Sequence, residues 1–297
     1  MTSGLDEDLW IRRYQEAAGS SPRLVCFPHA GGSASYFFSL SRALAPDIEV
    51  LAIQYPGRQD RHQERSAESI AELADGTYAA LRLHGILGAE AAVGAGVGSG
   101  AHSSSAAATS MSGTSAAAPS STSTSSTPTS PPVALFGHSM GAVVAFEVGL
   151  RMQRDGLTPP IHLFASGRRA PSRHRAELAV HLLDDAGLLA ELKRVGGTHK
   201  NILEDPELQQ LFLPTIRQDY RAIESYQYTP GPPLTCPVTV LTGDRDLAVT
   251  PAEAAAWEPH ASGRFDVRTY AGGHFFLEDH SAELIDLLRA EVGSSRL

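Results

Sequence analysis

The residue with the clearest potential for chemistry is Ser139, in the sequence Gly-His-Ser-Met-Gly at 137–141. A short apolar run at 133–136 precedes these residues, and an amphipathic stretch at 142–155 follows them. This order predicts a strand, a sharp turn and a helix, with the serine hydroxyl held out at the turn as a nucleophile. Because G-x-S-x-G alone occurs by chance in roughly one chain in ten of this length, other residues must support the assignment.

Acyl transfer to a serine requires a base, a carboxylate that orients the base, and donors for the oxyanion. Asp246 follows an apolar run at 238–241, and His274 follows a predicted strand at 265–270. With Ser139 they stand in the order Ser, Asp, His, which is the order of α/β-hydrolase triads. Residues that follow parallel strands can converge at one edge of the sheet. We therefore expect Ser139, Asp246 and His274 to form a catalytic triad.

Two backbone N–H groups are candidates for the oxyanion hole. Met140 follows the nucleophile at the start of the expected helix, where N–H groups have no partner within the helix. The second donor is expected in the His-Ala-Gly-Gly loop at 29–32, which follows an apolar run at 24–27. We favour Ala30, because this loop resembles the HGGG-type loop of hydrolases and its glycines allow close approach of the backbone.

Two triad positions have competitors nearby. Asp244 also follows the run at 238–241, but the acid of hydrolase sequences usually lies three residues after a glycine such as Gly243, which favours Asp246. Asp244 is then a turn or capping residue. His280 lies six residues after His274, and the Gly-Gly pair before His274 favours the earlier histidine.

The other histidines are expected to play no catalytic part. His29 and His138 flank the site and are expected to pack beside it. The remaining histidines, including His62, His84, His102 and His199, are expected at the surface. No group of His, Cys and carboxylate residues has the spacing of metal ligands, so we expect neither a metal nor an organic cofactor.

Strands and helices alternate along most of the chain. The residue patterns predict strands at 24–27, 48–53, 133–136, 161–165, 238–241 and 265–270. Helical spacing predicts helices at 70–81, after a capping box of Ser69 and Glu72, at 142–155 and at 282–292. This order predicts one α/β domain over residues 1–297, with a mostly parallel, doubly wound sheet. Ligands bind at the carboxyl edge of such sheets.

Residues 173–228 have helical patterns and no strand pattern. Leu182, Leu183, Leu188, Leu189, Leu192 and Val195 predict one helix. Asp205 as N-cap and Pro206 in the first turn predict the start of another, which Pro214 is expected to break or kink. Since this block lies between two late strands, we expect it to form a helical lid over the carboxyl edge.

Residues 88–131 differ in composition from the rest of the chain. Ala, Gly, Ser and Thr dominate, without an aromatic residue and with almost no charge. Such a segment buries too little apolar surface to offset the entropy of ordering it. We expect a disordered surface insertion that interrupts no motif.

Bulk properties exclude several classes of protein. The chain has 297 residues, 42% of them hydrophobic, and a net charge of −9, which makes a nucleic-acid partner unexpected. The first fourteen residues lack the apolar region of a signal peptide, and no run of 18 apolar residues predicts a membrane span. Cys26 and Cys236 lie in apolar segments and are expected to be reduced core residues. We therefore expect a cytoplasmic protein.

Several segments together are typical of one family. They are Phe27–Ala34, Tyr55–Arg58, Leu135–Ala142, Ser166–Pro171, Leu213–Tyr220 and Gly272–Leu277. From about Trp10 to Leu288 the chain resembles the type II thioesterases of polyketide and nonribosomal peptide biosynthesis, which have the α/β-hydrolase fold. Only the insertion departs clearly, because the family usually crosses that junction in a few residues.

The resemblance implies hydrolysis of acyl groups from the phosphopantetheine arm of acyl or peptidyl carrier proteins, which removes stalled or misprimed units. The family pattern maps its triad onto Ser139, Asp246 and His274, and its lid onto 173–228. The chain has no carrier-type Asp-Ser-Leu site, so the carrier is expected to bind in trans. The alternatives are a chain-releasing thioesterase, a general carboxylesterase or lipase, and a scaffold without activity.

Arginines are candidates for contact with the carrier. Arg58, Arg61, Arg168, Arg169 and Arg173 fall in predicted loops or at the ends of elements. One hypothesis is that some of them rim the entrance and bind the pantetheine phosphate or an acidic carrier helix. The alternative is that they are solvated surface residues.

Overall fold

The computed structural model describes residues 9–87, 130–173, 179–196 and 203–293. In this part of the chain seven strands form one sheet in the order β1-β3-β2-β4-β5-β6-β7. The strands are β1 (Ile11–Arg12), β2 (Arg23–Phe27), β3 (Glu49–Ile53), β4 (Val133–His138), β5 (His162–Ser166), β6 (Val238–Gly243) and β7 (Phe265–Tyr270). Only β1 runs antiparallel to its neighbour. The predicted α/β fold with a mostly parallel sheet is confirmed.

Strand β1 was missed from the sequence, because two residues are too few to show a period. The central strands were found because both of their faces are covered, so their sequences are continuously apolar. Every residue of β4 is buried. Alternate residues of β2 belong to two different cores, Leu24 and Cys26 to one and Val25 and Phe27 to the other.

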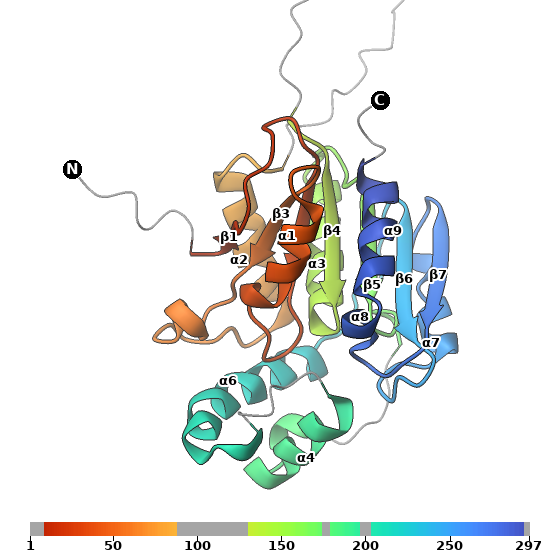
Figure 1. Cartoon of the computed structure of the whole chain (residues 1–297). Helices are drawn as coiled ribbons and strands as arrows, with labels where there is room; N and C mark the ends of the chain where they lie inside the picture. The colour runs from red at the N-terminus through yellow and green to blue at the C-terminus, as the bar shows by residue number, and fades with distance from the viewer. Residues whose placement is uncertain (1–8, 88–129, 174–178, 197–202, 294–297) are drawn as a thin grey trace, which may run out of the picture.

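Helices cover both faces of the sheet (Figure 1). The core that contains Val25 includes α2 (Ile70–Leu83), α3 (Met140–Arg154) and α7 (Pro251–Ala255). The core that contains Leu24 includes η1 (Ala34–Phe37), α1 (Phe38–Leu44), α8 (Phe276–Asp279) and α9 (Ser281–Gly293). We call the sheet and these helices the body. Two short 3₁₀ helices, η2 (Gln59–Arg61) and η4 (Glu258–His260), lie in its connections.

Helix α2 begins with half of the predicted capping box. Ser69 Oγ accepts a hydrogen bond from the Glu72 N–H at 3.2 Å. The Glu72 carboxylate accepts from the N–H of Glu68, so the reciprocal bond to Ser69 is replaced by one a residue earlier.

Helical elements from the predicted lid lie beyond one end of the strands (Figure 1). They are η3 (Val180–Leu182), α4 (Asp185–Val195) and α6 (Pro206–Glu224), which we call the cap. Their own small core consists of Leu188, Leu192, Leu213 and Ile216, all buried. Residues 174–178 and 197–202 of the predicted lid lie outside the described residues, as do residues 88–129 of the insertion predicted at 88–131.

Two expectations for the cap were wrong in detail. Leu182 and Leu183 do not belong to the helix of Leu188, because Asp184 caps α4 by accepting the Gly187 N–H, and the chain before it forms η3. Of the break or kink expected at Pro214, the break is excluded, because α6 begins as predicted at Asp205 and Pro206 and continues to Glu224. A proline removes one donor, while burial of Leu213 and Ile216 on either side holds the helix together.

Two histidines expected at the surface are buried. His162 stacks on Phe164, with ring centroids 4.1 Å apart, and its Nε2 bonds to Thr239 Oγ1 at 2.8 Å. His260 Nε2 bonds to Ser172 Oγ at 2.8 Å. A neutral imidazole with one polar partner can be buried, which the sequence pattern did not reveal. His102 and His199 lie outside the described residues.

The two cysteines are free and buried, as expected. Burial raises the pKa of the Cys26 thiol well above its usual value. Among the described helices, none is both long enough and apolar enough to span a bilayer.

Candidate active site

Ser139 is the single residue between the end of β4 and the start of α3. Its backbone has φ 53° and ψ −119°, a left-handed conformation that is strained for a residue with a side chain. The Ser139 N–H donates to the carbonyl of Ser166 at 2.7 Å, which fixes the turn to β5. The strand, turn and helix predicted from the sequence are therefore present, and they leave Ser139 at the apex.

The glycines on either side of Ser139 permit this turn. A Cβ at Gly137 would lie 2.2 Å from the carbonyl oxygen of Gly141, and a Cβ at Gly141 would lie 2.1 Å from that of Phe27. Both contacts are with backbone atoms, which have little freedom to move. The tight fit holds β4, α3 and the loop after β2 together.

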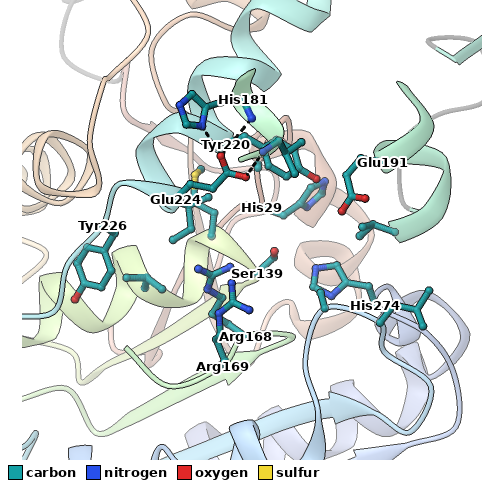
Figure 2. A pocket seen from close by; sticks show the side chains of 18 of the residues that line it. His29, Ser139, Arg168, Arg169, His181, Glu191, Tyr220, Glu224, Tyr226 and His274 are labelled. Atoms are coloured by element: carbon teal, nitrogen blue, oxygen red, sulfur yellow. Dashed lines mark hydrogen bonds and ion pairs between the residues drawn. The ribbon is translucent and has the colours of Figure 1, made fainter. Parts of the chain in front are cut away.

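The structure pairs His274 with Asp246. His274 Nδ1 lies 2.8 Å from Asp246 Oδ2, and both side chains are at most 5% exposed. Asp246 Oδ1 accepts the N–H of Ala248 at 2.7 Å, which fixes the carboxylate. With the proton on Nδ1, Nε2 is the basic nitrogen of the imidazole. Figure 2 shows Ser139 and His274 facing the same cavity, which both of them line.

The competing residues lie elsewhere. Asp244 Oδ1 accepts the N–H of Gly272 at 2.8 Å, so Asp244 supports the loop before His274 and is a turn residue. The ring of His280 bonds to the carbonyl of Ala271 and the carboxylate of Glu283. His280 does not line the cavity.

His138 packs beneath His274, with ring centroids 5.1 Å apart. Its Nδ1 bonds to Ser166 Oγ at 3.0 Å. Complete burial lowers the pKa of His138 well below 6.5, and the nearby His274 and His29 lower it further. His138 is therefore neutral near pH 7 and supports the ring of His274. His29 lines the cavity and packs edge-on against Phe275, at 4.9 Å between centroids.

The candidate oxyanion donors lie on neighbouring strand ends. Because β2 pairs with β4, with Phe27 opposite Gly137, the loop at 29–32 lies beside the Ser139 turn. Ala30 and Met140 both line the cavity together with Ser139. Met140 opens α3, where its N–H has no partner within the helix.

The loop at 29–32 is held by residues that the sequence analysis did not place there. The Gly31 N–H donates to Asp219 Oδ2 at 2.7 Å, and Arg58 Nη1 donates to the Gly32 carbonyl at 2.9 Å. Arg58 and Asp219 also form a buried ion pair. Asp219 was part of a recognised segment but was given no role, since a contact over 161 residues leaves no local signal.

The expectation that five arginines could rim the entrance was wrong for two of them. Arg58 is buried in its pair with Asp219. Arg61 is also buried; it pairs with Glu64, donates to the carbonyl of Gln54 and lies over the ring of Trp10. In contrast, Arg168, Arg169 and Arg173 line the cavity.

The cavity has a volume of about 580 Å³ and lies between the body and the cap. The body contributes the residues around Ser139 and the cap contributes mixed polar and apolar side chains. The cap residues on its wall include Leu183, Leu192, Tyr220, Ile223 and Glu224. Glu224 accepts the N–H groups of Val180 and His181, which fastens η3 to α6 (Figure 2). Burial raises the pKa of the Tyr220 hydroxyl, so this tyrosine is neutral.

A serine at a strained turn, a histidine–aspartate pair and two backbone donors around one cavity are the parts of an acyl-transfer site. The family model of the thioesterase domain matches residues 22–87 and 114–292 of the chain. The chain belongs to the thioesterase family. The family model passes over residues 88–113, which form part of the predicted insertion. The predictions of an α/β-hydrolase-type thioesterase and of a thioester hydrolase are confirmed.

Named relatives of this thioesterase come from biosynthetic pathways. Thioesterase PikA5 of Streptomyces venezuelae is 43% identical over 94% of this chain and 84% of its own. The gramicidin S biosynthesis protein GrsT of Aneurinibacillus migulanus is 30% identical over 94% of this chain and 92% of its own. The structure of the type II thioesterase BorB from the borrelidin cluster superposes with a TM-score of 0.76 at 41% identity, covering 96% and 98% of the two chains. The predicted kinship with type II thioesterases is confirmed.

Proposed function

We propose that this thioesterase hydrolyses acyl groups from the phosphopantetheine arm of acyl or peptidyl carrier proteins, in trans and in the cytoplasm. It removes stalled or misprimed units from a polyketide or nonribosomal peptide synthase. The observation that carries the proposal is the cavity lined by Ser139 and by His274, whose ring is paired with Asp246. The relationship to a type II thioesterase of a borrelidin cluster supports the choice of substrate class.

The proposed reaction has two halves. His274 Nε2 takes the proton of Ser139 Oγ, which attacks the thioester carbonyl, and the N–H groups of Ala30 and Met140 donate to the resulting oxyanion. The C–S bond breaks, and the pantetheine sulfur receives the proton from His274. His274 then takes a proton from water, which attacks the acyl-serine. The carboxylic acid leaves and Ser139 regains its proton.

Asp246 is proposed to act through His274. Its carboxylate holds the Nδ1–H tautomer and stabilises the imidazolium that forms in each half of the reaction. The side chains of Asp246 and His274 are both shielded from solvent. Shielding strengthens the interaction of the imidazolium with the carboxylate.

The cavity is proposed to hold the acyl group and the end of the pantetheine arm. Its volume of about 580 Å³ is within the range of roughly 300–1,000 Å³ common for small-molecule sites. The three arginines on its wall, Arg168, Arg169 and Arg173, are proposed to attract the pantetheine phosphate. The segment 173–228 is proposed to act as a lid of the single domain 1–297.

The test is mass spectrometry of carrier proteins loaded with short acyl groups, before and after incubation with the enzyme. We expect the wild type to return the free phosphopantetheine carrier and Ser139→Ala to leave the acyl carrier intact. Ser172→Ala is a matched control, because Ser172 bonds to His260 and does not line the cavity. Faster turnover of a p-nitrophenyl ester than of every acyl carrier would instead support a carboxylesterase, and preference for a full-length chain would support chain release.

A charge reversal tests the role of the arginines. Arg169→Glu with Arg173→Glu is expected to lower kcat/KM for acyl carriers and to leave that for a small acyl thioester without a phosphate unchanged. Equal loss for both substrates, or loss for neither, would remove these arginines from carrier recognition.

A further inference from the structure

The loop that carries Ala30 is held by a buried ion pair from two distant parts of the chain. Arg58 follows β3, and Asp219 lies in α6 of the cap. Arg58 Nη2 and Asp219 Oδ1 are 2.8 Å apart, and the two side chains are 4% and 2% exposed. This pair therefore links the cap to the body without access to solvent.

Both members of the pair use further atoms to hold the same loop. The second carboxylate oxygen of Asp219 accepts the Gly31 N–H at 2.7 Å, and the second terminal nitrogen of Arg58 donates to the Gly32 carbonyl at 2.9 Å. One carboxylate and one guanidinium thus hold the Ala30–Gly31 and Gly32–Ser33 peptide units, on either side of the Gly31–Gly32 peptide. Charge-assisted bonds of this kind are stronger and shorter than neutral ones.

The loop depends on these contacts because of its glycines. Gly31 has φ +77°, and a Cβ there would lie 2.8 Å from Ile216 Cγ1 of α6. A Gly-Gly backbone has little conformational preference of its own. The side chains of α6 and Arg58 therefore select the conformation in which Ala30 lies on the cavity wall.

We propose that the Arg58–Asp219 pair is a positioning device for the oxyanion hole. This inference rests on the proposed function, since it assigns Ala30 as an oxyanion donor. Neither side chain lines the cavity, so the pair acts through the loop and not on the substrate. An oxyanion hole requires donors fixed before the reaction begins, and a displacement of about 1 Å can reduce the rate on the order of 10²-fold.

Stability alone is a weak reason for this ion pair. Replacement of a buried pair by apolar residues of similar volume is often neutral or stabilising, because desolvation offsets the attraction of the charges. Without Arg58, Asp219 would also place a negative charge next to the loop whose Ala30 N–H is proposed to donate to the oxyanion. Arg58 cancels that charge and leaves the hydrogen bonds of Asp219 in place.

The device also constrains the cap. Asp219 and Ile216 both lie on α6, where Asp219 accepts the Gly31 N–H and Ile216 lies against Gly31. If α6 left the body, Gly31 would lose its acceptor. Catalysis therefore requires α6 to be seated, which couples closure of this side of the cavity to a competent oxyanion hole.

The test compares Asp219→Asn and the double variant Arg58→Met/Asp219→Leu with the control Thr215→Val. The double variant removes the loop contacts without leaving a buried charge, so it separates positioning from stability. Thr215→Val removes a contact of the same helix that does not touch residues 30–32. Each protein is titrated with a serine-reactive probe, so that kcat refers to folded sites only.

We expect kcat for a small acyl thioester to fall about 10- to 100-fold in both pair variants, with KM nearly unchanged. Affinity for an alkyl boronic acid, which forms a tetrahedral adduct on Ser139, should fall by the same factor. Affinity for an unreactive thioether analogue should stay constant, and Thr215→Val should resemble the wild type. A double variant with wild-type kcat and boronate affinity per titrated site would overturn the inference. Failure of wild-type enzyme on acyl carriers, with Ser139-dependent turnover of the small thioester intact, would overturn only the proposed substrate.

Discussion

The body and the cap of this molecule differ in the size of the core that holds each of them together. In the body, β4 is buried throughout and delivers Ser139 into a strained turn. The cap rests on a core of only four buried side chains, with partly buried hydrophobic side chains packed against it and exposed ion pairs such as that of Arg217 with Asp185. A dense core can hold a strained backbone in place, whereas a small core cannot. The candidate catalytic residues therefore lie on the body, and the cap forms the facing wall of the cavity.

The exception is the contact between the two regions. The Arg58–Asp219 pair joins α6 of the cap to the loop at 29–32 of the body and is buried to a similar degree as the His274–Asp246 pair. The cap thus combines a weakly packed outer part with one firmly anchored helix. Variants in each region should reveal this division.

The largest effect is expected from Ser139→Gly in the body. Loss of the nucleophile should lower kcat on the order of 10⁶-fold. Glycine should also relieve the strain at φ 53°, so that this variant unfolds at higher denaturant than Ser139→Ala, by about 1 kcal/mol. Turnover and urea unfolding measure the two effects.

Comparison of Ser139→Gly with Ser139→Ala tests whether the backbone of the turn at Ser139 is strained. Both remove the hydroxyl, so any difference in stability reports the backbone. Equal stability of Ser139→Gly and Ser139→Ala would mean that the body holds this turn without strain, and the contrast with the cap would lose its main support.

The second effect is expected from Asp246→Asn. The amide can no longer hold the productive tautomer of His274, so kcat should fall on the order of 10⁴-fold with little change in KM. Asp244→Asn is the matched control, because Asp244 bonds to the Gly272 N–H and not to His274. Steady-state kinetics on a small acyl thioester measures both. A larger loss in Asp244→Asn than in Asp246→Asn would reverse the assignment.

The same division explains what the sequence could predict. Ser139 and Asp246 each follow a buried strand, whose apolar run is a local signal, while the strand before His274 was expected to be buried and is only partly so. The turn at Ser139 was found because its glycines and the following helix lie within a few residues. All three residues of the candidate triad were therefore named from the sequence, and their catalytic roles stay predictions.

Contacts between body and cap left no such signal. Arg58 and Asp219 are 161 residues apart, and an arginine in a loop suggests exposure. Pro214 was expected to break a helix, but the loss of one hydrogen bond is outweighed by burial on both sides of it. Each of these outcomes depends on tertiary packing, which local pattern does not contain.

The third prediction compares the loss of stability caused by a cavity in the body with that caused by a cavity in the cap. Leu135→Ala in β4 and Leu188→Ala in α4 both truncate completely buried leucines. We expect Leu135→Ala to lower the global free energy of unfolding by about 2–5 kcal/mol. Leu188→Ala should lower amide protection mainly in α4 and raise KM more than it lowers kcat, because the cap opens below the global unfolding free energy.

Hydrogen exchange followed by mass spectrometry distinguishes local from global opening. Protection of β4 and α3 should stay at the wild-type value in Leu188→Ala. Uniform loss of protection across the body in that variant would show that cap and body unfold as one unit, and the proposed division would be wrong.

The smallest effect is a dependence of body stability on pH. Burial lowers the pKa of His162 from 6.5 to about 4, so the unfolded chain binds this proton more tightly than the folded one. The stabilising contribution is complete above pH 6.5 and is lost as the pH falls toward 4. Between pH 7 and pH 5 it should amount to about 2 kcal/mol. His162→Gln should remove this part of the pH dependence.

Urea unfolding at pH 5 and pH 7 measures the change, with His62→Gln as the control at an exposed histidine. Because His162 belongs to β5 and bonds to Thr239 of β6, protonation should weaken the body and leave exchange in α4 unaltered. Loss of α4 protection in step with the body at pH 5 would instead mean that the cap depends on the sheet for its stability. The seated helix α6 would then transmit body stability to the whole cap, and the Arg58–Asp219 pair would be the contact through which it does so.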